Sequence, residues 1–127
     1  MKNTAIANST IYKIDNITNS SVGQININAS SIFELEPSPD NPILYAEGAR
    51  NISTPPYILK SIYIINTTSN TVSDTITNQN ITQSSTAIIS QNGKFIFIAS
   101  GSGSASGNIL VFNTTSAVFA NRKSYSK

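Results

Sequence analysis

Ile62-Tyr63-Ile64-Ile65-Asn66, followed by Thr67-Thr68-Ser69-Asn70, is the stretch that decides the fold, because its pattern occurs three times. Residues 11–19 (Ile-Tyr-Lys-Ile-Asp, then Asn-Ile-Thr-Asn) and residues 109–117 (Ile-Leu-Val-Phe-Asn, then Thr-Thr-Ser-Ala) repeat it. The first isoleucines are 51 and 47 residues apart (62 − 11 and 109 − 62). Each copy is an apolar run closed by Asp or Asn, whose side chain can accept backbone N–H bonds in a turn. A second short apolar stretch follows, so each copy predicts a β-hairpin.

A second pair of strands lies between these hairpins and also repeats. Two apolar stretches are joined by a turn in each copy: residues 31–35 and 43–46 around Ser38-Pro39-Asp40-Asn41, and residues 86–90 and 95–99 around Gln91-Asn92-Gly93-Lys94. Pro39 presets φ for its turn, and Gly93 permits a positive φ in the other. One period therefore contains four short strands, which is the content of one propeller blade.

The two units together resemble the YVTN-type β-propeller repeat. Residues 38–46 are similar to the first half of that repeat, and residues 63–72 are similar to its second half. The resemblance extends from Thr10 to about Ala120 and implies four-stranded antiparallel blades. It describes the scaffold of a blade and not a functional site. Asn41 and Gln91 depart from the repeat, and residues 50–60 lengthen one loop.

The repeat divides the chain, taken as one repeat region over residues 1–127, into blades. Residues 11–27 are predicted to form a half blade, 31–77 a full blade and 85–120 a second full blade, with 121–127 as a tail. A closed propeller needs at least about four blades, so the prediction is an all-β, incomplete propeller. It would be a segment of a longer propeller, a subunit of an assembled ring, or an open β-structure. A β-sandwich with duplicated hairpins is the alternative.

Composition excludes several kinds of chemistry. The chain contains neither cysteine nor histidine, which excludes disulfides, thiolate and imidazole metal ligands, and a Ser-His-Asp triad. Charged residues make up 11% of the chain, less than half of the usual ~25%, and the formal net charge is +2. The basic residues Arg122, Lys123 and Lys127 are interpreted as part of a solvated tail, so no nucleic-acid partner is predicted.

The sequence carries little information on localisation. Met1–Asn8 has one lysine and no apolar run, so it does not have the pattern of a signal peptide. The longest mostly apolar stretch, residues 62–65, is too short to span a bilayer. The compartment is therefore left unknown. An extracellular or cell-surface location is favoured if the chain is part of a longer exported protein.

No catalytic, cofactor-binding or metal-binding residue is predicted, and no cofactor is expected. Glu34 and Glu36 share one face of a strand, but catalytic carboxylate pairs usually come from different strands, so we interpret both as surface or edge charges. Gly101–Gly107 is rich in glycine like a phosphate-binding loop. The residues after it read as a strand and not as a helix, which favours a flexible loop.

Asn-x-Ser/Thr sequons are the only modification signal. Several lie at predicted turns, where a glycan would be exposed, and duplication of the repeat explains part of their number. The possible glycosylation sites are Asn8, Asn16, Asn19, Asn28, Asn51, Asn66, Asn80 and Asn113.

These observations favour a non-enzymatic β-propeller-repeat protein that acts as a protein-binding or cell-surface structural module. Its partner would be another protein, or a second copy joined through edge strands. A fragment of a propeller enzyme, either a lactonase-like hydrolase or a dehydrogenase-like chain, is the alternative that the resemblance leaves open.

Overall fold

The structure of the chain, a computed structural model, describes residues 8–54, 58–77, 86–101 and 106–126. These residues form ten β-strands and no helix, and hence no helix that could cross a membrane. The strands are β1 (Ser9–Asp15), β2 (Ser20–Ile27), β3 (Ser31–Pro37), β4 (Ile43–Asn51), β5 (Ile58–Asn66), β6 (Thr71–Thr77), β7 (Thr86–Ile89), β8 (Phe95–Gly101), β9 (Ser106–Asn113) and β10 (Val118–Ser126).

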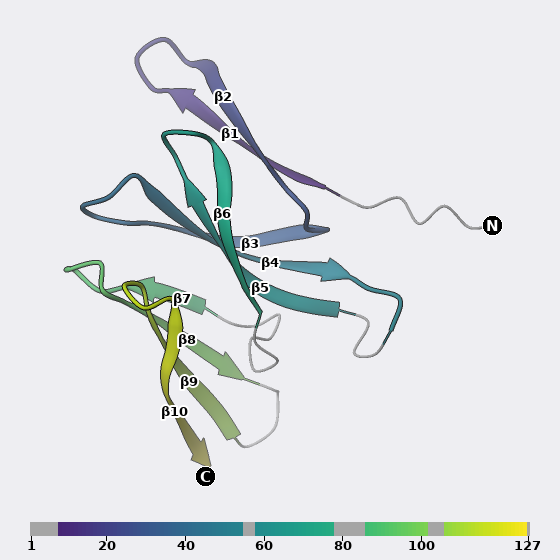
Figure 1. Ribbon diagram of the computed structural model, residues 1–127, viewed down its shortest axis with the longest axis vertical. Coiled ribbons are helices and arrows are strands. Elements are labelled where there is room, and N and C mark those ends of the chain that lie inside the picture. The colour runs from purple at the N-terminus through teal and green to yellow at the C-terminus, as the bar shows by residue number, and fades with distance from the viewer. Residues whose placement is uncertain (1–7, 55–57, 78–85, 102–105, 127) are drawn as a thin grey trace.

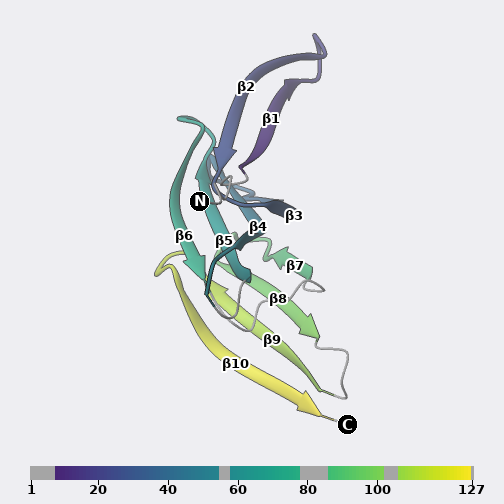
Figure 2. The ribbon, with the colours of Figure 1, turned by 90° about the vertical axis from the view of Figure 1, so that its right-hand side faces the viewer.

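The strands form three antiparallel sheets that follow one another in a row (Figure 1). The first sheet is the hairpin β1-β2, the second has the order β3-β4-β5-β6, and the third has the order β7-β8-β9-β10. Strands β6 and β10 lie on one side of the row, whereas β3 and β7 lie on the other (Figure 2). The predicted all-β fold with four-stranded antiparallel blades is confirmed.

The third sheet extends farther than the sequence predicted. Strand β10 continues to Ser126, which pairs with Ser106 of β9, so the prediction of a tail from residue 121 is wrong. The stretch Asn121-Arg122-Lys123-Ser124 has no apolar alternation to indicate a strand. Its strand conformation comes from backbone pairing with β9, which requires no particular side chains.

The three hairpin turns have the same geometry. A side-chain oxygen caps each turn by accepting backbone N–H bonds from the residues two and three positions on, at 2.7–2.9 Å and 3.1 Å. The capping residues are Asp15, Asn66 and Asn113. The fourth residue after each cap has a left-handed φ of 55–57°, and these residues are Asn19, Asn70 and Ala117. The repeat seen in the sequence is therefore a repeat of backbone conformation.

A β-bulge also recurs at the same place in each hairpin. The second strand of each hairpin, which is β2, β6 or β10, contains one extra residue a short distance after the turn. Before the bulge, Ile11, Ile62 and Ile109 occupy the same register position. Equal turns and bulges give three hairpins in which corresponding side chains point to corresponding faces.

The inner hairpins β3–β4 and β7–β8 correspond in the same way. The backbone N–H of Ser38 bonds the carbonyl of Ile43 at 2.9 Å, and Ser90 bonds Phe95 at 2.8 Å. This makes Tyr45 of the second sheet equivalent to Phe97 of the third. The hairpin turns then make Ile62 equivalent to Ile109.

Two apolar cores hold the row together. We call the side of a sheet that is turned toward the earlier sheet its preceding face, and the other side its following face. The first core joins the following face of the first sheet to the preceding face of the second: Ile25, Ile27, Ala29, Ala46, Tyr63 and Ile65. The second core joins the second sheet to the third: Tyr45, Ile62, Ile64, Ala87, Ile96, Ile98, Leu110 and Phe112. Each junction therefore unites a following face with a preceding face.

Replacing Ala117 by glycine is expected to raise the free energy of unfolding by about 0.5–1 kcal/mol. Alanine at a φ of 57° carries a steric cost that glycine avoids. The reciprocal change, Asn19→Ala in the equivalent turn, is expected to lower stability by a similar amount, because alanine tolerates this φ less well than asparagine. Urea titrations measure both. Equal destabilisation by both changes would contradict the expectation.

Candidate functional site: buried carboxylates and an open sheet face

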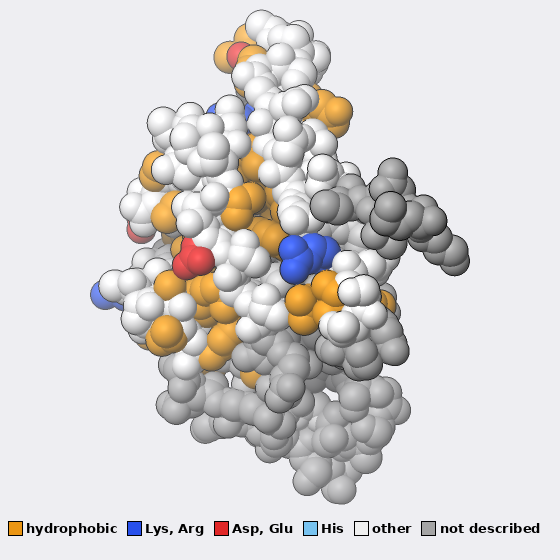
Figure 3. Space-filling view, turned by 45° about the vertical axis from the view of Figure 1, so that its right-hand side comes forward, with side chains coloured by type: hydrophobic (Ala, Val, Ile, Leu, Met, Phe, Trp, Pro, Cys, Tyr) orange, Lys and Arg blue, Asp and Glu red, His pale blue; other side chains and the backbone are white. Residues whose placement is uncertain are grey.

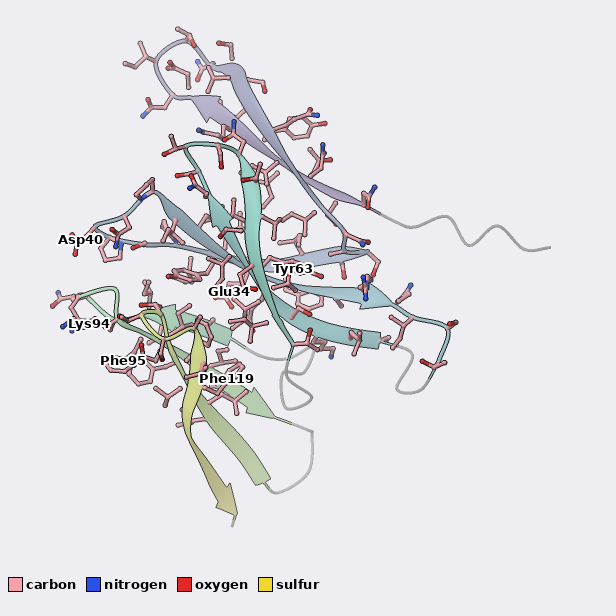
Figure 4. The ribbon with its side chains drawn as sticks, in the orientation of Figure 1. Glu34, Asp40, Tyr63, Lys94, Phe95 and Phe119 are labelled. Atoms are coloured by element: carbon pink, nitrogen blue, oxygen red, sulfur yellow. The ribbon has the colours of Figure 1, made fainter. Side chains whose placement is uncertain are left out.

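Two glutamates meet on the following face of the second sheet. Glu34 of β3 is the cross-strand partner of Glu47 of β4, so their side chains share one face. Glu34 lies between the second and third sheets (Figure 4). Its Oε2 accepts a hydrogen bond of 2.8 Å from the backbone N–H of Ala87 in β7. Glu34 therefore links β3 and β7, the first strands of two consecutive sheets.

Glu47 is the most unusual ionisable group in the described part of the chain. It is 4% exposed, and neither carboxylate oxygen has a hydrogen-bond donor. Burial is the main cause that raises the pKa of Glu47 from 4.5 to about 7, and the adjacent Glu34 carboxylate contributes to the same increase. Glu47 therefore holds its proton at pH values where exposed glutamates are ionised.

Glu36 belongs to the same acidic face. Burial raises the pKa of Glu36 and the charge of Glu34 raises it further, while a backbone hydrogen bond from Ile89 lowers it. Glu34 and Glu36, which we interpreted as surface or edge charges, both lie on β3, an edge strand of the second sheet. Both also interact with β7 of the third sheet. Glu47 was missed by sequence reasoning. Its only signal is an acid inside the otherwise uncharged run of residues 43–49. In the part of the chain that the structure describes, no group of three acidic side chains is arranged to hold a metal ion.

The following face of the third sheet is open. Phe97 lies on it and is 38% exposed, whereas the equivalent Tyr45 is 6% exposed beneath the third sheet. Ile88 of β7 is also exposed on this sheet. Phe95 lies 6.4 Å from Phe97 between ring centroids, and both come from β8. Apolar side chains that an intermediate sheet buries are therefore left uncovered on the third.

Charged side chains are sparse on the described part of the face drawn in Figure 3. Over the described part of the face drawn in Figure 3, uncharged polar side chains and backbone predominate, with apolar side chains between them. This agrees with a charged fraction of 11%.

A solved structure has this arrangement of strands. It is the hydrazine synthase of Kuenenia stuttgartiensis, which superimposes on 84% of this chain with a TM-score of 0.68 and 17% sequence identity. The match covers 33% of the hydrazine synthase chain, so this chain spans about a third of its length. At this identity the likeness concerns the fold alone. No family model and no curated protein matches the sequence.

The structure separates the sequons by exposure. Five of the asparagines are exposed: Asn8, Asn16, Asn19, Asn28 and Asn51. Asn66 and Asn113 are half-buried, and their side-chain oxygens cap the hairpin turns. Asn80 lies outside the described residues. Asn16 and Asn19 are brought together in one turn, and the other exposed sequons are spread along the first two sheets.

The glycine-rich segment is followed by a strand. Residues 102–105 lie outside the described residues, and β9 begins at Ser106. A phosphate-binding loop would open a helix at this point.

Proposed function

We propose that this chain is a non-enzymatic β-propeller-repeat protein, similar to the YVTN type, that serves as a protein-binding or cell-surface structural module. The observation that carries the proposal is the open following face of the third sheet. Apolar surface of this kind marks protein interaction sites when it is contiguous. Its partner would be another β-sheet with an apolar face, because that is what covers the equivalent face of the second sheet.

The edge strands offer further contacts. Strand β1 is equivalent to β5 and β9, each of which pairs with a strand on both sides, whereas β1 pairs only with β2 in the described structure. An unpaired edge can add a strand from a partner. A cell-surface setting is supported by the low charge and by the exposed sequons, which leave room for glycans.

The alternative, a fragment of a lactonase-like or dehydrogenase-like propeller enzyme, is favoured by one observation. A carboxyl group with a pKa near neutrality, such as that of Glu47, is suited to proton transfer. Both Glu47 oxygens are closed to solvent, however, so a substrate would not reach them in this arrangement. The pair is better explained as a contact between sheets.

Self-association tests the proposal. Sedimentation equilibrium over a wide concentration range is expected to give masses that rise above 13.6 kDa. The double change Phe97→Thr and Val111→Thr, which we call the following-face variant, is expected to weaken association about tenfold or more, because it removes apolar contact area from the open face while keeping strand-forming residues.

The control for this experiment is Ile17→Thr, which removes an apolar side chain that is 87% exposed in the first hairpin turn. It is expected to associate like the wild type. Equal weakening by the control, or a following-face variant that associates normally, would refute the role of the open face.

A further inference from the structure

The opposite end of the row has an open face of its own. Tyr12 and Ile14 lie on the preceding face of the first sheet, because Ile11 packs into the first core on the other side. They are 62% and 58% exposed, while their equivalents in the second sheet, Tyr63 and Ile65, are 5% and 0% exposed. Tyr12 and Ile14 are therefore side chains of the kind that a preceding sheet covers.

The two open faces correspond to the two halves of one junction. Inside the chain, Ile62 and Ile64 of a following face pack with Leu110 and Phe112 of a preceding face. When the three hairpin turns are aligned, Ile109 and Val111 correspond to Ile62 and Ile64 of the following face. In the same alignment, Tyr12 and Ile14 correspond to Leu110 and Phe112 of the preceding face. Six of these eight side chains are aliphatic, and the other two, Phe112 and Tyr12, are aromatic. One chain thus carries both members of a contact that it already makes twice.

We infer that the following face of the third sheet binds the preceding face of the first sheet in a second copy, so that copies join head to tail. The inference rests on the proposed function and specifies its partner. A following face meeting a following face is disfavoured, because both existing junctions pair unlike faces. The contact is heterologous, so two or more copies form a ring when the rotation closes and a filament when it does not.

The first sheet has only its two outer strands. The contact would therefore form mainly over β9, where Ile109 and Val111 lie.

Mixing two complementary variants tests the inference. The preceding-face variant carries Tyr12→Thr and Ile14→Thr, and the following-face variant keeps Tyr12 and Ile14 intact. Each variant alone is expected to be monomeric at concentrations where the wild type associates. An equimolar mixture is expected to form mixed complexes in native mass spectrometry, because each variant supplies the face that the other lacks. Since a misfolded variant could not complement, the mixture also controls for folding.

A conservative variant, Tyr12→Phe with Ile14→Val, keeps the face apolar and is expected to associate like the wild type. Association of the preceding-face variant with itself would overturn head-to-tail joining while leaving the proposed function intact. A mixture of the two folded variants that stays monomeric would also overturn it. A folded wild type that remains monomeric throughout would overturn both the inference and the proposed self-association.

Discussion

At pH 8 the Glu47→Gln variant is expected to be more stable than the wild type by up to about 3 kcal/mol, and its stability should fall less than that of the wild type between pH 4.5 and 7. Burial raises the pKa of Glu47 to about 7 in the folded protein, against 4.5 in an exposed glutamate. At about 1.4 kcal/mol for each unit, ionising this group in the folded state costs close to that amount. Glutamine keeps the shape of the side chain and cannot ionise.

The direction of the wild-type profile follows from proton binding. Between pH 4.5 and 7 the folded state binds more protons than the unfolded state, so stability falls as the pH rises. The contribution of Glu47 is fully present below pH 4.5 and is lost as the pH passes through about 7. Glu36, whose pKa is also raised, adds to the same slope. Asp15 acts in the opposite sense, since backbone hydrogen bonds from Thr18 and Ile17 lower its pKa, and its contribution is lost only as the pH falls below about 4.

Urea unfolding at pH 4.5, 6 and 8 measures the profile. Asp40→Asn is the matched control, because it removes an exposed carboxylate from a turn of the same sheet. In this control, the free energy of unfolding should change with pH as it does in the wild type. A Glu47→Gln variant whose stability changes with pH as steeply as that of the wild type would show that Glu47 does not control the pH dependence.

Truncating Phe112 to alanine is expected to cost about 3–5 kcal/mol of the free energy of unfolding. Phe112 is fully buried in the core between the second and third sheets. Its ring meets that of Phe119 edge to face, with centroids 5.3 Å apart. Removing it leaves a cavity and breaks an aromatic pair. Because small domains have only about 5–15 kcal/mol of stability, this one change is expected to bring the chain close to unfolding.

Phe97→Ala provides the comparison, since it removes the same atoms from the open face of the same sheet. We expect it to cost about 1 kcal/mol or less, because Phe97 already contacts solvent. Chemical denaturation followed by circular dichroism measures both variants. Similar losses would mean that the second core contributes no more than the open face does.

Most of the fold could be predicted because its determinants are local. The capping residues Asp15, Asn66 and Asn113 act on backbone amides two and three positions away, so they appear in the sequence as a spaced motif. The apolar runs of β1, β5 and β9 are local as well. The predicted strand at β10 ended too early for the converse reason. The last residues of β10 are held by backbone pairing with β9 and have no apolar pattern of their own.

The buried carboxylates could not be predicted in the same way. Glu34 faces Glu47 only because the β3–β4 register shifts between Ile32 and Glu34, and a bulge of this kind leaves no signal in spacing. The bond from Ala87 to Glu34 joins residues 53 positions apart on separate sheets. Gly48 illustrates the same limit: a Cβ there would lie 2.7 Å from the carbonyl oxygen of Ser31, a close approach that only the paired strands create.

The recurring bulge has a consequence for the last strand of every sheet. An extra residue increases the twist of the strand that carries it. Because β2, β6 and β10 each carry one at the same distance from the turn, each of these strands is twisted at the same place. The added twist is thus a property of each repeat, and adding or removing repeats would not change it in the others.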